Sequence, residues 1–368
     1  MTGSPLVHVV GARPNFIKAA PVIAALAERG IAQLLVHTGQ HYDEALSDVF
    51  FRELALPRPD VHLGVGSGSH ARQTAALLEA LEPVIVERAP PLVVVYGDIN
   101  STLAAALVAA KLHVPLAHVE AGLRSFDMTM PEEINRRVTD MLADLLFVTS
   151  PEGLDNLARE GIDTARAHFV GNPMIDTLLA NLDRLDPGPR RAALELPERY
   201  GVVTIHRPSN VDRPADADRL VGALAGVAEL LPLVLPLHPR GRATLDAAGL
   251  RQVENLRVVE PLGYVDFVSL VRGAALVVTD SGGIQEETTM LGVPCLTVRP
   301  NTERPITISH GTNRLVDPAG VRDVARQVLD GALAAPSGKP PLWDGHAGER
   351  IGALTEEWLR SRAMLPAQ

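Results

Sequence analysis

Short apolar runs alternate with alanine-rich helical stretches along almost the whole chain. The runs have the length of strands, are rich in Val, Leu and Ile, and lack an alternating polar face, which is typical of strands covered on both sides. Strands of this kind separated by helices predict a parallel sheet with helices on each face. In the first half the expected strands are Leu6–Val10, Gln33–Thr38, Leu92–Tyr96, Leu116–Val119, Leu145–Thr149 and His168–Val170.

The series lapses once, between Asn181 and Arg199, where Pro, Arg and Glu are frequent. A second series of strands follows, and 368 residues exceed the ~250–300 at which a single hydrophobic core stops growing. We therefore expect an α/β protein of two doubly wound, Rossmann-type domains facing a central cleft. They would span residues 1–175 and 176–350, with a C-terminal helix in 351–368 packing back on the first domain. The second-series strands are expected at Val202–Ile205, Leu233–Leu237, Leu256–Val259, Leu276–Thr279, Leu296–Val298 and Arg314–Val316.

The charge balance limits the partners of such a protein. Lys and Arg total 34 against 44 Asp and Glu, a net charge of −10. Broad nucleic-acid or membrane binding draws on basic surfaces, so neither partner is expected, although a local cluster of cations could still bind an anion. The single cysteine, Cys295, forbids an intrachain disulfide, and no apolar run approaches the ~18 residues of a membrane span. We expect a cytoplasmic protein.

The residues just after the strands should carry the function, because open α/β sheets bind ligands beyond the carboxyl ends of their strands. GARPNFIKAAP follows the first strand and brings Arg13 and Lys18 to a helix N-terminus, a suitable corner for phosphate or carboxylate. A solvated helix start is the alternative. The GxGxxG spacing is absent, so this is no dinucleotide fingerprint.

TDSGGIQEE is the second such junction of strand and helix. Ser281, Gly282 and Gly283 can turn successive backbone N–H groups toward phosphate oxygens at the positive end of a helix. Glu286 and Glu287 follow, either as charges that complement the helix dipole or as a grip on ribose hydroxyls. The order of strand, glycine turn and early acid favours a nucleotide.

Three carboxylates gather at the ends of first-domain elements. Asp98 and Glu120 follow apolar strands, and Glu132 opens the helix PEEINRR. Asp98 could merely cap a helix and Glu132 merely pair with Arg136. Convergence of three acids is costly unless a ligand or cation needs them, so the set predicts a proton-transfer site.

Two histidines, His206 in HRPSN and His238 in PLHPR, follow second-domain strands and could balance phosphate charge. No metal-ligand spacing or nucleophile motif is evident, so we expect no metal.

In these motifs the chain resembles the non-hydrolysing UDP-N-acetylglucosamine 2-epimerases. The match runs through nearly the whole length, in the order GARPNFIKAAP, TGQHYD, VYGDINST, HVEAGLRS, PEEINRR, TDSGGIQEE and TERPITISHGTNRLV. The family fold is GT-B-like, with two Rossmann-type domains around a cleft, and agrees with the expectation above.

The resemblance implies reversible isomerisation of UDP-GlcNAc and UDP-ManNAc. A base removes the C2 proton while UDP leaves from C1, which gives a bound 2-acetamidoglucal; UDP and a proton then return on the opposite face. Carboxylates near the ring and cations on the diphosphate suit this chemistry, and no cofactor is required.

Motif positions carry roles over to individual residues. Asp98, Glu120 and Glu132 become the acid/base candidates, with Arg136 orienting Glu132. The other assignments concern the nucleotide: Arg13, Lys18 and His206 on the departing diphosphate, Ser281, Gly282 and Gly283 on the phosphates, Glu287 on the ribose, Phe267 on the uracil and Arg304 on the diphosphate or ring.

Some family members also bind a second UDP-GlcNAc as an activator. The matching positions here are Gln40, His41, Arg207 and His238. HRPSN stands where many members have an HRREN-like motif, so Pro208 and Ser209 depart from that pattern.

Other functions stay open at this level. RSFDMTMPEEINR is similar to epimerases acting on UDP-2,3-diacetamido-glucuronic acid, whereas TERPITISHGTN is more like the GlcNAc enzymes, and we give the latter more weight. A GT-B glycosyltransferase would need an acceptor and lack the acid cluster, and a sugar-nucleotide sensor would bind without turnover. We expect a homodimer, the commonest soluble assembly, serving cell-envelope polysaccharide or secondary-metabolite glycan synthesis.

Overall fold

The computed structural model describes residues 4–39, 51–237, 241–333 and 338–363. The chain forms two compact units, one of Met1–Ala180 with Pro341–Gln368 and one of Asn181–Pro340. We call them unit 1 and unit 2 and describe each by itself. Among the described residues, no helix is both long and apolar enough to cross a membrane.

Unit 1 contains a seven-stranded sheet with the order β3-β2-β1-β4-β5-β6-β7, in which every described pairing is parallel. The order reverses direction between β1 and β4, and at such a switch point the two flanking loops turn to opposite faces and leave a crevice. The strands are β1 (Leu6–Val10), β2 (Gln33–His37), β3 (Val61–His62), β4 (Val93–Tyr96), β5 (Leu116–Ala121), β6 (Leu145–Val148) and β7 (Ala167–Phe169).

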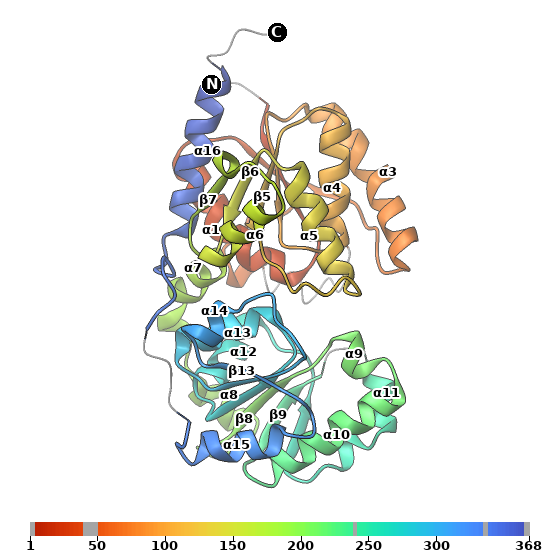
Figure 1. Ribbon diagram of the computed structural model, residues 1–368, viewed down its shortest axis with the longest axis vertical. Coiled ribbons are helices and arrows are strands. Elements are labelled where there is room, and N and C mark those ends of the chain that lie inside the picture. The colour runs from red at the N-terminus through yellow and green to blue at the C-terminus, as the bar shows by residue number, and fades with distance from the viewer. Residues whose placement is uncertain (1–3, 40–50, 238–240, 334–337, 364–368) are drawn as a thin grey trace. The chain divides into compact units, whose positions relative to one another are not determined.

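Helices cover both faces of this sheet, with α3, α4 and α5 on one side and α1, α7 and α16 on the other (Figure 1). The C-terminal helix α16 packs directly on α1: a Cβ added at Gly348 would lie 2.6 Å from the carbonyl oxygen of Pro21. The helices are α1 (Arg13–Glu28), α3 (His70–Arg88), α4 (Asn100–Lys111), α5 (Pro131–Leu142), α6 (Pro151–Arg159), the 3₁₀ turn η1 (Thr164–Arg166), α7 (Pro173–Ala180) and α16 (Ala347–Ala363).

Unit 2 has a six-stranded parallel sheet of order β10-β9-β8-β11-β12-β13, the Rossmann order, with its switch point between β8 and β11. The strands are β8 (Gly201–Thr204), β9 (Leu233–Pro236), β10 (Leu256–Val259), β11 (Leu276–Thr279), β12 (Cys295–Val298) and β13 (Asn313–Val316). The helices are η2 (Leu182–Arg184), α8 (Pro187–Ala193), α9 (Pro208–Val211), α10 (Pro214–Ala228), α11 (Arg242–Ala247), η3 (Leu250–Gln252), α12 (Tyr264–Arg272), α13 (Gly282–Leu291), α14 (Ile306–Ser309) and α15 (Val321–Leu329).

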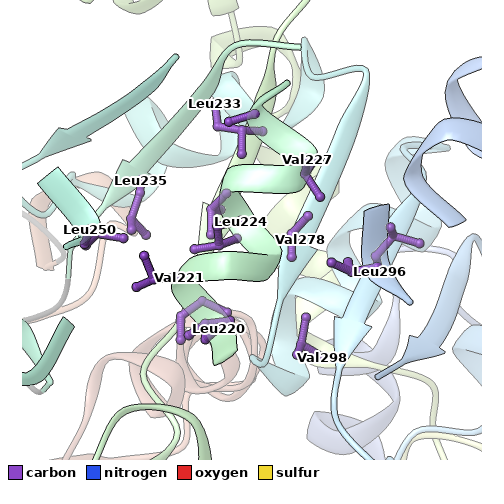
Figure 2. Close-up of a cluster of buried hydrophobic side chains, with 14 of the residues drawn as sticks. Leu220, Val221, Leu224, Val227, Leu233, Leu235, Leu250, Val278, Leu296 and Val298 are labelled. Atoms are coloured by element: carbon purple, nitrogen blue, oxygen red, sulfur yellow. The ribbon is translucent and has the colours of Figure 1, made fainter. Parts of the chain in front are cut away.

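The larger core of unit 2 lies under α10. Leu220, Leu224 and Val227 recur at helical spacing and face the strand residues Leu235 and Val278 (Figure 2). Each such side chain, when fully buried, contributes about 1.5–3 kcal/mol of transfer free energy. The packing fixes α10 and the sheet as a rigid support for the loops at the carboxyl edge.

The predicted fold class is confirmed, and most predicted strands agree with the structure within one or two residues. The elements that were not predicted include β3, which has only two residues, and α3, which follows a glycine-rich loop and contains Pro83. The connection after Asn181 contains a 3₁₀ turn and a short helix, α8.

Candidate active site

The predicted site residues lie at the carboxyl edge of each sheet, next to the switch point. In unit 1, Arg13 and Lys18 are on the helix after β1, and Asp98 follows β4. In unit 2, His206 and Arg207 follow β8, and Ser281 follows β11. The topology therefore gathers residues that are far apart in sequence into one group per unit.

The corner after β1 is tightly built. A Cβ added at Gly11 would lie 2.5 Å from the hydroxyls of both Thr38 and Ser101, so only glycine fits there. The Asn15 side chain accepts from the backbone N–H of Gly11 at 3.1 Å and donates to the Tyr96 carbonyl at 2.9 Å. Asn15 thus ties the first turn of α1 to the end of β4, where Asp98 is carried.

Lys18 forms a buried ion pair with Glu120. Gly97, with φ of +62°, lies against this ion pair. A Cβ added at Gly97 would lie 3.1 Å from Lys18 Nζ and 3.2 Å from Glu120 Oε2. This pair joins α1 and β5 beneath the turn that precedes Asp98. Lys18 is therefore placed against one of the predicted acids, a contact that the sequence did not predict.

Glu120 has an unusual backbone conformation, with φ of +76°. The pairing of β5 with β6 shifts register between Val119 and Ala121, so the glutamate sits at a bulge. A non-glycine residue in the left-handed region is strained, and such strain persists only where the surroundings enforce it. The bulge re-aims the carboxylate, as bulges do beside active sites.

Asp98 contacts an arginine of α5. Arg136 Nη2 donates to Asp98 Oδ2 at 2.5 Å, and its Nη1 donates to Glu133 Oε2 at 3.0 Å. Glu133 is fully buried and also accepts from the backbone N–H and the hydroxyl of Ser125. From the sequence we expected Arg136 to orient Glu132. In the structure, Arg136 instead donates to Glu133, the next residue of α5. Glu132 is half-buried in the first turn of this helix.

In unit 2, Asp280 joins the two loops of the switch point. This fully buried carboxylate accepts from the backbone N–H groups of His206 at 3.0 Å and Arg207 at 2.9 Å, and from Asn210 Nδ2 at 2.9 Å. His206 Nδ1 lies 3.3 Å from Asp280 Oδ1, and almost half of the imidazole is exposed. The loop after β8 is thereby fixed with His206 toward solvent.

The helix α13 begins at Gly282 with Ser281 as its N-cap, directly after β11. An added Cβ at Gly282 would collide with Arg304 Nη1 and lie 2.8 Å from Glu303 Oε1. Arg304 is buried and forms ion pairs with Glu286 and Glu303. An arginine therefore packs beside the half-buried helix start formed by Ser281, Gly282 and Gly283, which suits an anion there.

Glu287, the predicted ribose ligand, is buried within α13. Burial and the neighbouring Glu286 raise the pKa of Glu287 to about 8, although Tyr264 favours the ionised form. Its Oε1 atom has no hydrogen-bond partner among the described residues. A buried carboxyl oxygen without a partner suits a ligand that brings hydroxyl groups.

The remaining predicted residues lie near these groups or outside the described part. Phe267, on α12, is half-buried against the smaller unit 2 core. Arg207 donates to the Asp280 carbonyl at 3.0 Å and lies 3.5 Å from Glu303. Three predicted activator residues, Gln40, His41 and His238, fall outside the described residues.

The sequence did not single out several buried titratable residues that hold the site. They are His118, Glu133, Asp140, Asp280 and Glu303. Their position was visible in part, since Glu133 and Asp280 stand beside predicted residues within PEEINRR and TDSGGIQEE. Within the described ranges, no three His, Cys, Asp or Glu side chains are grouped so that they could hold a metal ion.

Comparison with known proteins identifies the family. The family model described as UDP-N-acetylglucosamine 2-epimerase matches residues 24–356. The chain belongs to this family. A UDP-N-acetylglucosamine 2-epimerase of Methanocaldococcus jannaschii is 39% identical over 356 residues, covering 93% of this chain and 96% of the relative. A UDP-2,3-diacetamido-2,3-dideoxy-D-glucuronate 2-epimerase of Pseudomonas aeruginosa is 42% identical over 318 residues, covering 85% and 88%.

Solved structures agree. The M. jannaschii UDP-GlcNAc 2-epimerase in complex with UDP-GlcNAc and UDP has a TM-score of 0.90 at 38% identity, covering 96% of this chain and 99% of that one. The Neisseria meningitidis enzyme bound to UDP-GlcNAc has a TM-score of 0.84 at 27% identity, covering 97% and 100%. The predicted family, the GT-B-like fold and the enzyme class, an isomerase, are confirmed.

Proposed function

We propose that the protein interconverts UDP-GlcNAc and UDP-ManNAc by elimination of UDP to 2-acetamidoglucal and its re-addition. The observation that carries the proposal is the pairing of Asp98 with Arg136 and of Glu120 with Lys18 at one sheet edge. Carboxylates fixed in this way can exchange a proton with C2, while α13 of unit 2 offers a helix N-terminus for the diphosphate.

Each residue has a defined task in this scheme. Asp98, Glu120 and Glu132 carry the acid/base steps, and Arg136 fixes Asp98. When C2–H breaks, the electron pair forms the C1–C2 double bond and the C1–O bond breaks, so UDP leaves with its charge. Arg13, Lys18 and His206 steady that charge, and Arg304 lies behind the phosphate-binding turn.

The nucleotide is held by unit 2. The backbone N–H of Ser281 donates to the Thr279 hydroxyl at 2.9 Å, so the phosphates are held by the Ser281 side chain and the backbone N–H groups of Gly282 and Gly283. Glu287 accepts from the ribose hydroxyls, and Phe267 contacts the uracil. Glu287 Oε1, for which the described part of the chain offers no hydrogen-bond partner, supports the ribose assignment. The reaction requires no nicotinamide and no metal ion.

A second substrate is favoured by one observation. The relative acting on UDP-2,3-diacetamido-glucuronate is 42% identical, comparable with the 39% of the GlcNAc enzyme. We keep UDP-GlcNAc first because the match to the latter covers 93% of the chain against 85%.

Chromatography of purified protein with each sugar nucleotide in D₂O tests both. Formation of UDP-ManNAc with deuterium at C2, without an acceptor, supports the proposal and rules out a glycosyltransferase or a sensor. Turnover of the diacetamido-uronate alone would replace the substrate and keep the mechanism. Binding of UDP-GlcNAc without exchange or turnover of either compound would overturn the proposal.

Activation by a second UDP-GlcNAc, a homodimeric state, a cytoplasmic location and a role in polysaccharide synthesis stay predictions. A sigmoidal rate against UDP-GlcNAc concentration would support the activator site that includes Arg207.

A further inference from the structure

His118 is a buried histidine of unit 1 that the scheme above leaves without a role. It lies on β5, two residues before Glu120, and is fully inaccessible to solvent. Its Nδ1 is 2.6 Å from Asp140 Oδ1 of α5, and its Nε2 is 2.7 Å from the carbonyl oxygen of Gly97. One imidazole thus contacts the helix that carries Arg136 and the turn that carries Asp98.

Both contacts require the ring to donate. A carbonyl oxygen can only accept a hydrogen bond, and so can an ionised carboxylate. Burial disfavours the charge of Asp140, but the contacts that its carboxylate makes, among them the hydrogen bond from the guanidinium of Arg124, outweigh burial and hold the pKa of Asp140 below its ordinary value. A neutral imidazole has one N–H, so two donated bonds need the imidazolium.

Asp140, the acid beside the ring, is also held by an arginine. Asp140 Oδ2 accepts from Arg124 Nη1 at 2.7 Å and from the Gly122 N–H at 3.1 Å. Arg124 in turn binds Glu160 with Nε at 3.0 Å and Nη2 at 2.6 Å. Arg137 Nε also lies 3.2 Å from Glu160 Oε1, so the two arginines balance the two carboxylates, and the imidazolium follows from the two hydrogen bonds that the ring donates.

The position of the imidazole shows which parts of unit 1 its two hydrogen bonds connect. Gly97 lies between the Lys18–Glu120 pair and Asp98, in a left-handed backbone conformation that glycine adopts without strain. Its carbonyl points at His118, while Asp140 lies one helical turn beyond Arg136, the residue that binds Asp98. Movement of the ring would shift both sides of the Asp98 contact together.

From this geometry we infer that His118 is a positioning residue, held as an imidazolium that locks the Gly97–Asp98 turn to α5 and keeps Asp98 and Glu120 in register. The inference rests on the proposed function for its kinetic consequence alone. The protonation state and the support of the turn can be measured without substrate.

The first test is nitrogen NMR of the intact protein with ¹⁵N-labelled histidine at about pH 8, above the ordinary histidine pKa of about 6.5. We expect two protonated ring nitrogens for His118, assigned by the loss of its signals in His118→Gln. His8 serves as the internal reference, since burial lowers its pKa to about 4 and it must appear neutral. A neutral His118 would overturn the inference.

The second test separates the two bonds. In His118→Asn the amide nitrogen stands near Nδ1 and can still reach Asp140, whereas in His118→Gln it stands near Nε2 and can still reach Gly97. We expect kcat to fall about 10²-fold in the Asn variant, the size of effect that follows a 1 Å misplacement, and less in the Gln variant. The dissociation constant for UDP, bound by unit 2, should not change in either.

A matched control is His8→Asn, which removes another buried imidazole of the same sheet whose bond goes to the Tyr96 hydroxyl at 2.8 Å. Hydrogen-exchange mass spectrometry should show faster exchange in the peptide containing Gly97 for His118→Asn and not for the control.

A folded His118→Asn with wild-type kcat and exchange would overturn the inference. If that variant fails to fold, the NMR result on the wild-type protein decides. A wild-type protein without turnover of any sugar nucleotide would overturn the proposed function and leave the NMR test intact.

Discussion

The acids assigned to the site differ between the two units. In unit 1 the acids at the sheet edge contact cations: Asp98 binds Arg136, Glu120 binds Lys18, and Asp140 binds Arg124. In unit 2, Glu303 has such partners, but no cation among the described residues pairs with Glu287, and its pKa rises to about 8.

The difference corresponds to two kinds of chemistry. A carboxylate beside a cation keeps its charge and a fixed orientation, as a group that takes a proton from carbon requires. A carboxyl group left in a buried place without a cation keeps its hydrogen-bonding capacity for a ligand. We therefore assign proton transfer to unit 1 and nucleotide recognition to unit 2, and the changes below test that division.

The largest effect is expected for Asp98→Asn. The amide cannot accept the C2 proton, so deuterium exchange at C2 should fall by about 10³-fold or more, within the range for loss of a general base. UDP affinity should stay at the wild-type value, because the proposed nucleotide site is in unit 2. Isothermal titration with UDP and proton NMR of the sugar measure the two quantities, and Asp155→Asn, on the exposed face of α6, is the control. Exchange at the wild-type rate would remove Asp98 from the mechanism.

Lys18→Met tests whether the cation of unit 1 also stabilises the fold. It leaves Glu120 buried without its partner, and breaking a buried pair in this way costs about 3–5 kcal/mol. We expect the free energy of unfolding from urea titration to fall by that amount. Lys111→Met, at the exposed end of α4, should change it by less than about 0.5 kcal/mol. Equal effects of the two substitutions would contradict a structural role for the pair.

Gly282→Ala tests the proposed phosphate site of unit 2 by adding a methyl group at the start of α13. The new methyl group would displace Arg304 from the start of α13, and overpacking of this kind costs about 1–3 kcal/mol. We expect UDP to bind about 10–100-fold more weakly, with kcat at saturating substrate retained. Gly222→Ala on α10, where an added Cβ meets open space, should leave affinity unchanged. A normal UDP affinity in Gly282→Ala would argue against phosphate binding at this turn.

The fold was readable from the sequence because its strands are continuous apolar runs, and β1, β10 and β11 begin and end where they were predicted. Motif positions likewise placed Asp98 and Ser281 at strand ends. What could not be read were contacts that depend on side-chain direction. Arg136 reaches Glu133 rather than Glu132, although both are within helical reach, because Glu133 faces inward toward Ser125. The Lys18–Glu120 pair joins residues 102 positions apart, which no local pattern can reveal.

Glu287→Gln is expected to change the pH dependence of stability. The pKa of Glu287 is about 8 in the folded protein against an ordinary 4.5, so between these values the folded state holds a proton that the unfolded state has lost. Stability from this group is therefore complete below about pH 4.5 and falls as pH rises toward 8, with a slope of at most about 1.4 kcal/mol per pH unit. Urea titrations of wild type and variant across this window should differ by that slope, since glutamine does not titrate, whereas Glu254→Gln, on the surface, should follow wild type. Parallel curves for Glu287→Gln and wild type would mean that Glu287 is already ionised near neutral pH, and would remove the contrast between the acids of the two units.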